Sequence, residues 1–130
     1  IAATQAAKDR RSLHFDVVPA SAGATWEIDW RPALSQLLEA DPADAPQWAA
    51  AFHRGLVDAM VEVCCHAGVK SVALSGGCFQ NALLRGLADE SLATVGFNVL
   101  AARELPPNDG AIAAGQALGA LWHLTTVEMP

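Results

Sequence analysis

Two short apolar runs flank a helical segment in the second half of the chain, and this order most constrains the fold. Residues 70–74 (KSVAL) and 97–101 (FNVLA) are predicted strands, and residues 81–95 between them place leucines at helical spacing. A strand, a helix and a second strand in this order make a right-handed crossover in which the two strands run parallel. The chain is therefore predicted to hold a parallel sheet covered by helices.

The remaining predicted elements place a hairpin and two helices before this unit and one helix after it. They are two strands at residues 13–18 and 25–30 around the turn PASAG, a short helix from Pro32 through Leu38, a longer helix from near Pro46 to about His66, and a last helix at residues 109–124. Alternating polarity predicts the strands, and prolines predict the helix starts. The order ββααβαβα describes an α/β fold with a mixed, mostly parallel sheet and helices against it.

Composition and charge limit the functions that a chain of this length can serve. With 130 residues, 52% hydrophobic and 17% charged, residues 1–130 are expected to form a single globular domain. The longest apolar runs fall far short of the roughly 20 residues of a bilayer span, and the N-terminus lacks the layout of a signal peptide. We therefore expect no membrane partner and a cytoplasmic location. The net charge of −6, without a Lys/Arg cluster, disfavours nucleic acid as a partner.

The cysteines and histidines do not form a complete metal site or a disulfide framework in the sequence. The three cysteines include no CxxC pair, which fits a reducing compartment. The four histidines are dispersed, so no single helix can point two of them at one metal ion. Any metal site must therefore draw ligands from elsewhere.

The segment VALSGGCFQN places a glycine pair where a strand ends and a helix begins. Gly76 and Gly77 let the backbone approach a ligand closely, and the free amides of the following helix attract an anion such as phosphate. Asn81, one turn into that helix, could donate to a phosphate oxygen or a ribose hydroxyl. The alternative is structural: such a turn needs glycines, and Asn near a helix start is a cap.

The segment LPPNDGAIAAGQALG is the second candidate site. Asp109 falls at the N-terminus of the last helix, where the helix dipole favours a carboxylate and where strands of an open α/β sheet end. It could coordinate a cation, or it could be an ordinary N-cap. Gly115 and Gly119, four residues apart, are expected to allow close packing against a helix or the sheet.

Other conspicuous side chains favour structural roles. His53, between apolar positions of the long helix, is expected to be a histidine at the edge of the core with a satisfied ring nitrogen, the alternative being a catalytic base. Cys78 could be a nucleophile activated by a helix N-terminus, or a small buried thiol. The tryptophans are expected to pack in the core because they are spread over different elements; they are Trp26, Trp30, Trp48 and Trp122.

The two candidate segments together resemble the C-terminal part of the hydrogenase maturation carbamoyltransferase family, HypF. The resemblance rests on SGGCFQN followed by PPNDGAIAAGQA, with DWRPALSQLL and AAFHRGL upstream, and it extends from about Trp26 onward. Two departures are mild: Cys78 stands where an aliphatic residue is usual, and Ala111 follows Gly110 where a second glycine is common.

This resemblance implies an RNase H-like lobe of the actin-like ATPase superfamily, related to the tRNA threonylcarbamoyl transferase subunit. The family makes carbamoyl-adenylate from carbamoyl phosphate and ATP and passes the carbamoyl group to the C-terminal cysteine of the partner HypE, for the cyanide ligand of [NiFe] hydrogenase. Carried onto this chain, Gly76, Gly77 and Asn81 would hold the adenylate. Asp109 would supply one ligand to a divalent metal, Zn or Fe. No residue is assigned as a catalytic nucleophile or base.

The same resemblance implies that the chain lacks the N-terminal lobe, with its H-x-x-x-H metal ligands, and further upstream domains. The piece alone is therefore expected to be inactive. Three alternatives stay open: a non-catalytic lobe of a split enzyme or an oligomerisation module that self-associates, a nucleotide-dependent phosphotransferase, and a carbamoyltransferase acting on a small molecule.

Overall fold

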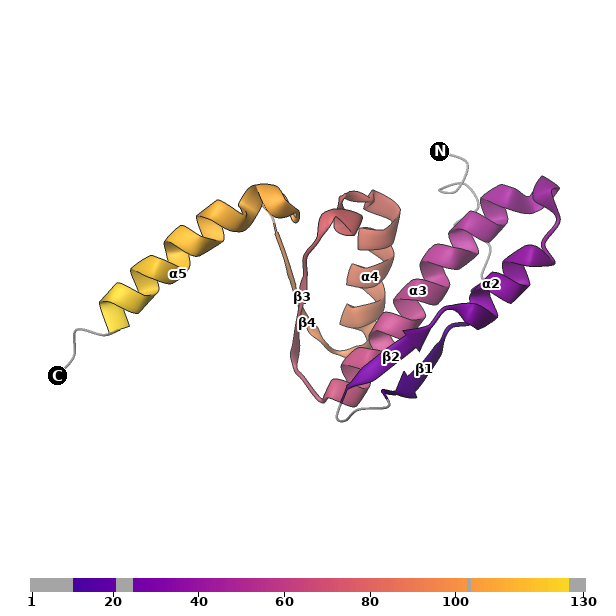
Figure 1. Ribbon diagram of the computed structural model, residues 1–130, viewed down its shortest axis with the longest axis horizontal. Coiled ribbons are helices and arrows are strands. Elements are labelled where there is room, and N and C mark those ends of the chain that lie inside the picture. Colours follow the sequence, from indigo (N-terminus) through magenta and orange to yellow (C-terminus); the bar gives the residue numbers. More distant parts are fainter. Residues whose placement is uncertain (1–10, 21–24, 103, 127–130) are drawn as a thin grey trace.

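The longest helix organises the fold. The computed structural model describes residues 11–20, 25–102 and 104–126, and in it helix α3, Ala45–Ala67, is 23 residues long (Figure 1). Pro46 lies in its first turn, where a missing amide hydrogen costs nothing, and Gly68 ends it in the left-handed conformation (φ 64°). The predicted bounds, from near Pro46 to about His66, are confirmed to within two residues.

An antiparallel hairpin and a short helix precede α3. Strands β1, Asp16–Pro19, and β2, Trp26–Asp29, pair with Asp16 opposite Asp29. Both are shorter than predicted, and part of the PASAG turn lies outside the described residues. Helix α2, Arg31–Leu38, follows. The side chain of Asp29 accepts a hydrogen bond from the Arg31 amide (2.9 Å), which satisfies one of the free donors at the helix start.

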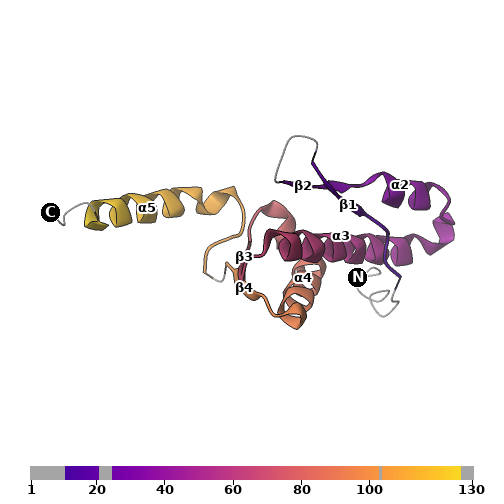
Figure 2. The same cartoon turned by 90° about the horizontal axis from the view of Figure 1, so that it is seen from below.

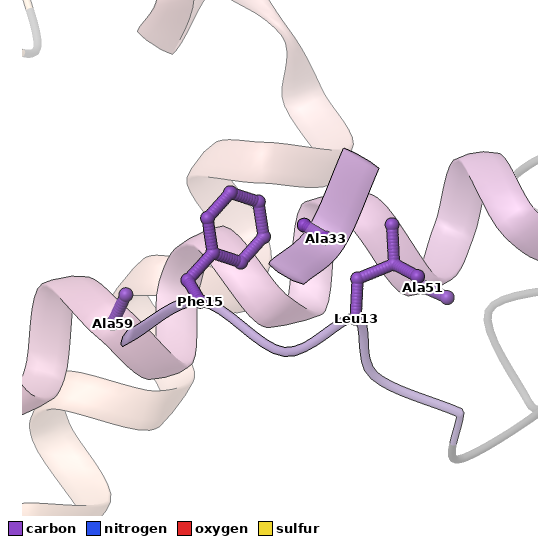
Figure 3. Packing of buried hydrophobic residues seen from close by; sticks show 5 residues of the cluster. All are labelled: Leu13, Phe15, Ala33, Ala51 and Ala59. Carbon is purple, nitrogen blue, oxygen red and sulfur yellow. The ribbon is translucent and has the colours of Figure 1, made fainter. Parts of the chain in front are cut away.

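The first hydrophobic core joins the chain before β1 to α2 and α3. Figure 3 shows Leu13 and Phe15 lying against the alanines of the two helices. The Leu13 amide donates to the Ala51 carbonyl (3.1 Å), so this stretch is fixed on the helix and does not pair in the hairpin. This contact explains why β1 begins at Asp16 and not at Leu13.

The parallel unit is formed as predicted. Strand β3, Ser71–Leu74, and strand β4, Asn98–Ala101, pair in parallel, and helix α4, Ala82–Val95, makes the crossover. The second core fills the space between this sheet and the helices; its buried members are Val57, Leu74, Leu84, Ala88 and Leu92. Helix α3 therefore contributes to both cores, Ala51 and Ala59 to the first and Val57 to the second.

The predicted single mixed sheet is not found among the described residues. The α/β class and the order ββααβαβα are confirmed, but the strands form two separate two-stranded sheets, β1–β2 and β3–β4. The hairpin packs on α3 through the first core, whereas the parallel pair packs through the second (Figures 1 and 2). The hairpin therefore does not extend the parallel pair into one sheet.

The last helix extends away from the other elements. A 3-10 turn, Asp109–Ala111, leads into α5, Ile112–Thr126, whose residues are all exposed (Figures 1 and 2). The close packing expected of Gly115 and Gly119 is not found among the described residues, since a Cβ added at either position would meet nothing within 4 Å. No helix among the described residues is long and apolar enough to cross a membrane.

Two of the four tryptophans also depart from the prediction. Trp30 and Trp122 are 59% and 72% exposed, whereas Trp26 and Trp48 are half-buried. Trp122 lies on α5, whose residues are all exposed, and the Trp30 side chain is not a member of the first core although α2 contributes Ala33 to it.

Candidate functional site

The glycine turn after β3 has a backbone that only glycine adopts readily. Gly76 has φ 103° and ψ 156°, a region that is strained for any residue with a Cβ. A short 3-10 helix, Gly77–Gln80, follows, with the Phe79 amide donating to the Gly76 carbonyl (3.1 Å). Gly77 is exposed, and a Cβ there would meet nothing within 4 Å. The turn thus presents open backbone at the end of β3.

A hydrogen bond joins the glycine turn to the proline loop that follows β4. The Gly76 amide donates to the Pro107 carbonyl. The carboxyl ends of parallel strands meet at one edge of a sheet, which is where open α/β folds bind ligands. A second bond fixes the start of the same loop, since the Arg85 guanidinium of α4 donates to the Ala102 carbonyl (3.2 Å). The two segments singled out in the sequence therefore lie side by side.

Asn108, not Asp109, caps the turn that leads into α5. The Asn108 side chain accepts a hydrogen bond from the Gly110 amide (3.0 Å), so the alternative interpretation of Asp109 as an N-cap is wrong. Asp109 is exposed in the first turn of the 3-10 helix, and its carboxylate has no hydrogen-bond or ion-pair partner among the described residues. This carboxylate is available to a ligand.

Asn81 is the N-cap of α4 and does not lie one turn inside it, as the sequence analysis expected. Its side-chain oxygen accepts from the amides of Leu83 (3.0 Å) and Leu84 (3.2 Å). Its side-chain nitrogen lies 3.0 Å from Nε2 of His53 on α3. The capping role and a ligand role are compatible, because they use different atoms of the amide.

A groove of about 490 Å³ opens beside the two joined loops. It runs from the exposed face of β3 and β4 to the proline loop; its lining includes Leu74, Ser75, Leu100, Pro106, Asn108 and Ala111. Ser75 precedes the glycine pair and Asn108 precedes Asp109, so the groove borders both candidate segments. Its walls are mostly apolar, which suits a flat organic group better than a bare ion.

The described residues do not by themselves complete a metal site. No cluster of three or more histidine, cysteine or acidic side chains occurs among residues 11–20, 25–102 and 104–126. The unpartnered Asp109 carboxylate is a hard oxygen donor and fits one position in the coordination sphere of a divalent cation. The remaining ligands would have to come from outside this part of the chain.

The cysteines are free thiols, and one lies in the glycine turn. Cys78 is exposed on the 3-10 helix, so its alternative interpretation as a buried thiol is wrong. Cys64 is half-buried at the edge of the second core, and burial raises the pKa of its thiol, with a smaller contribution from neighbouring Cys65. Cys64 is therefore poorly suited to act as a thiolate.

Comparison with known proteins agrees with the family resemblance of the two candidate segments. Residues 2–116 match the family described as carbamoyltransferase, Kae1-like domain, second subdomain. The chain belongs to the HypF carbamoyltransferase family. Among curated relatives, it is 42% identical to carbamoyltransferase HypF of Synechocystis over 91 residues, which cover 70% of this chain and 12% of the relative. It is also 42% identical to HypF2 of Cupriavidus necator over 121 residues, which cover 80% of this chain and 15% of that relative.

Solved HypF structures share the fold. A full-length HypF crystallised in the phosphate- and nucleotide-bound form matches with a TM-score of 0.71 and 28% identity, over 85% of this chain and 15% of that one. The HypF of T. kodakarensis matches with a TM-score of 0.64 and 27% identity, over 95% of this chain and 16% of that one. The chain thus spans less than a fifth of the length of these HypF proteins.

The structure also reveals contacts that sequence reasoning missed. The satisfied ring nitrogen expected of His53 is found, since Nδ1 lies 2.7 Å from the Ala49 carbonyl, but its second bond, to the cap of α4, was not predicted. The bond from Arg85 to Ala102 was not predicted either. No local pattern could have shown either contact, because His53 and Asn81 lie 28 residues apart and Arg85 and Ala102 lie 17 residues apart. The ligand roles of Gly76, Gly77, Asn81 and Asp109 stay predictions.

Proposed function

We propose that this chain is the C-terminal lobe of a HypF-type carbamoyltransferase domain. In this proposal, carbamoyl-adenylate, made from carbamoyl phosphate and ATP in another domain, gives its carbamoyl group to the C-terminal cysteine of a HypE-type acceptor in the cytoplasm. The thiocarboxamide formed on the acceptor is the precursor of the cyanide ligand of [NiFe] hydrogenase. The observation that carries the proposal is the hydrogen bond from Gly76 to Pro107, which joins the two family segments at one edge of the sheet.

Each candidate residue has a separate task in this reaction. The open backbone at Gly76 and Gly77 lets phosphate approach the amides of the turn, and the Asn81 amide donates to the nucleotide. Asp109 supplies one ligand to a divalent metal, Zn or Fe. When bound, such a metal withdraws charge from the phosphate or carbamoyl oxygens.

The transfer itself needs orientation more than a protein nucleophile. The acceptor thiolate attacks the carbamoyl carbon, a C–S bond forms, the C–O bond to the phosphate breaks, and AMP leaves. Fixed amides near the phosphate stabilise the leaving group and hold the carbonyl in line with sulfur. This division of work explains why the described site offers backbone and amide donors and no Ser-His or Cys-His pair.

The other lobe and the upstream domains belong to the proposed active unit. Because this chain spans only 12% of the Synechocystis relative and 15% of HypF2 of Cupriavidus necator, we expect it to be inactive without them. Incubating the isolated chain with carbamoyl phosphate, ATP and an acceptor peptide should give no thiocarboxamide by mass spectrometry. Robust carbamoylation would show that the residues outside this chain are dispensable and that the proposed roles are wrong.

Asp109 provides the sharpest test of the proposal. In the full-length carbamoyltransferase carrying this segment, Asp109→Asn removes the charge but keeps the shape, and we expect carbamoyl transfer to fall by roughly 100-fold or more with little change in stability. Bound metal, measured by mass spectrometry of the purified protein, should fall as well.

Glu104→Gln is the matched control, because Glu104 is an exposed acid in the same loop with no proposed role. It should retain normal transfer and metal content. If Asp109→Asn behaved like Glu104→Gln, Asp109 would not be a ligand and the metal part of the proposal would fail.

A further inference from the structure

His53 makes two hydrogen bonds that together fix its protonation pattern. Its Nδ1 lies 2.7 Å from the Ala49 carbonyl, which can only accept, so Nδ1 carries the hydrogen. Its Nε2 lies 3.0 Å from the Asn81 side-chain nitrogen, which can only donate, so Nε2 accepts. The ring is thus a neutral acceptor directed at Asn81.

Asn81 is held at both ends of its amide. The oxygen accepts from two backbone amides of α4, at 3.0 and 3.2 Å, and one hydrogen on the nitrogen is donated to His53. The second hydrogen on that nitrogen has no acceptor among the described residues. Because an amide group is planar, fixing its oxygen and one hydrogen also fixes the direction of the remaining N–H.

We propose that His53 is a positioning residue, which orients this remaining Asn81 N–H toward the nucleotide. The inference rests on the proposed function, since it needs Asn81 to contact the adenylate. It assigns to α3 a part in a site otherwise built from the two loops.

Two observations separate this role from simple packing. The cap of α4 uses only the Asn81 oxygen, so the helix start does not need His53. The contact between α3 and α4 is made by the buried side chains of the second core, such as Val57, Leu84 and Ala88. The helix start and the core between α3 and α4 thus have contacts of their own, and the bond from His53 is the one that restricts rotation of the Asn81 amide at its nitrogen.

The test uses AMP binding to the full-length carbamoyltransferase carrying this segment, measured by titration calorimetry. Asn81→Ser keeps a capping oxygen and removes the amide donor. His53→Phe keeps a ring beside Phe52 and removes the acceptor, and His53→Gln restores an acceptor near the position of Nε2. If His53→Phe did not fold, His53→Leu would serve in its place.

We expect His53→Phe to weaken AMP binding by about threefold to tenfold, the effect of one hydrogen bond, and His53→Gln to restore most of it. In the Asn81→Ser background, His53→Phe should cause no further loss, because the two residues act as one unit.

The outcomes distinguish the two proposals. If Asn81→Ser weakens binding but His53→Phe does not, the inference about His53 is overturned and the nucleotide role of Asn81 stands. Additive losses in the double variant would also overturn it, since His53 would then act independently of Asn81. If Asn81→Ser binds AMP normally, the proposed nucleotide contact itself fails.

Discussion

Gly76 and Gly77 are adjacent, but the structure places different constraints on them. Gly76 has a positive φ of 103°, whereas Gly77 has an ordinary φ and open space where a Cβ would lie. Gly76 is therefore required by the backbone, and Gly77 is free of any constraint within the described residues. A requirement at Gly77 would have to come from a ligand or from parts of the protein outside the described residues.

This difference predicts opposite behaviour of two alanine variants. Gly76→Ala should lower the free energy of unfolding by about 1–3 kcal/mol because the added Cβ strains the turn. Gly77→Ala should leave stability within about 0.5 kcal/mol. Denaturant unfolding of the two variants measures both effects.

Nucleotide affinity is a second measurement that tests the Gly77→Ala variant. If the backbone there approaches a phosphate, Gly77→Ala should weaken AMP binding to the full-length protein although it folds normally. Unchanged binding would mean that Gly77 does not approach the nucleotide, and equal stability losses in both variants would contradict the distinction between the two glycines.

At the scale of elements, α3 approaches the segment before β1 most closely at Gly55. A Cβ added at Gly55 would lie 2.0 Å from the Leu13 carbonyl oxygen and 2.9 Å from the Phe15 ring. The Leu13 backbone cannot move away freely because its amide is bonded to Ala51. The first core therefore depends on the absence of a side chain at Gly55.

Gly55→Ala should destabilise the chain by roughly 3 kcal/mol through this overlap. Gly86→Ala is the matched control, because Gly86 lies within α4 and a Cβ there would meet nothing within 4 Å. It should stabilise the chain by roughly 0.5–1 kcal/mol, since alanine favours helix. Equal effects in urea unfolding would show that the close approach at Gly55 is relaxed in solution.

At the scale of the whole molecule, α5 exposes an apolar surface without a partner in this part of the chain. Leu118, Leu121 and Trp122 lie on one face at helical spacing and are 68%, 59% and 72% exposed. Contiguous exposed apolar surface of this kind marks an interaction site. In the proposed complete enzyme, residues outside this chain would cover it.

The isolated chain should therefore self-associate in sedimentation experiments, with a mass that rises with concentration. The double substitution Leu121→Glu and Trp122→Glu should shift it toward the monomer. Leu38→Glu is the control, because Leu38 is 79% exposed on α2, away from α5, and should not change the association. A monomer at all concentrations would show that α5 does not drive association.

The order of the elements, most of their bounds and the two candidate segments could be predicted from the amino-acid sequence. These features depend on local signals: the spacing of apolar residues sets helix or strand, prolines mark helix starts, and Gly68 and Gly96 end helices in the left-handed conformation. The motifs SGGCFQN and PPNDGAIAAGQA also sufficed to indicate the family, because a short motif is recognised from consecutive residues without knowing how the chain folds.

Which distant groups meet could be seen only in the folded chain. The packing of whole elements separated the strands into two sheets and placed the Gly76 amide against the Pro107 carbonyl and the His53 ring against Asn81. Periodicity is a local property, whereas a hydrogen bond between distant residues depends on how whole elements pack. For the same reason the sequence could not show that α5 extends from the other elements with its apolar surface exposed.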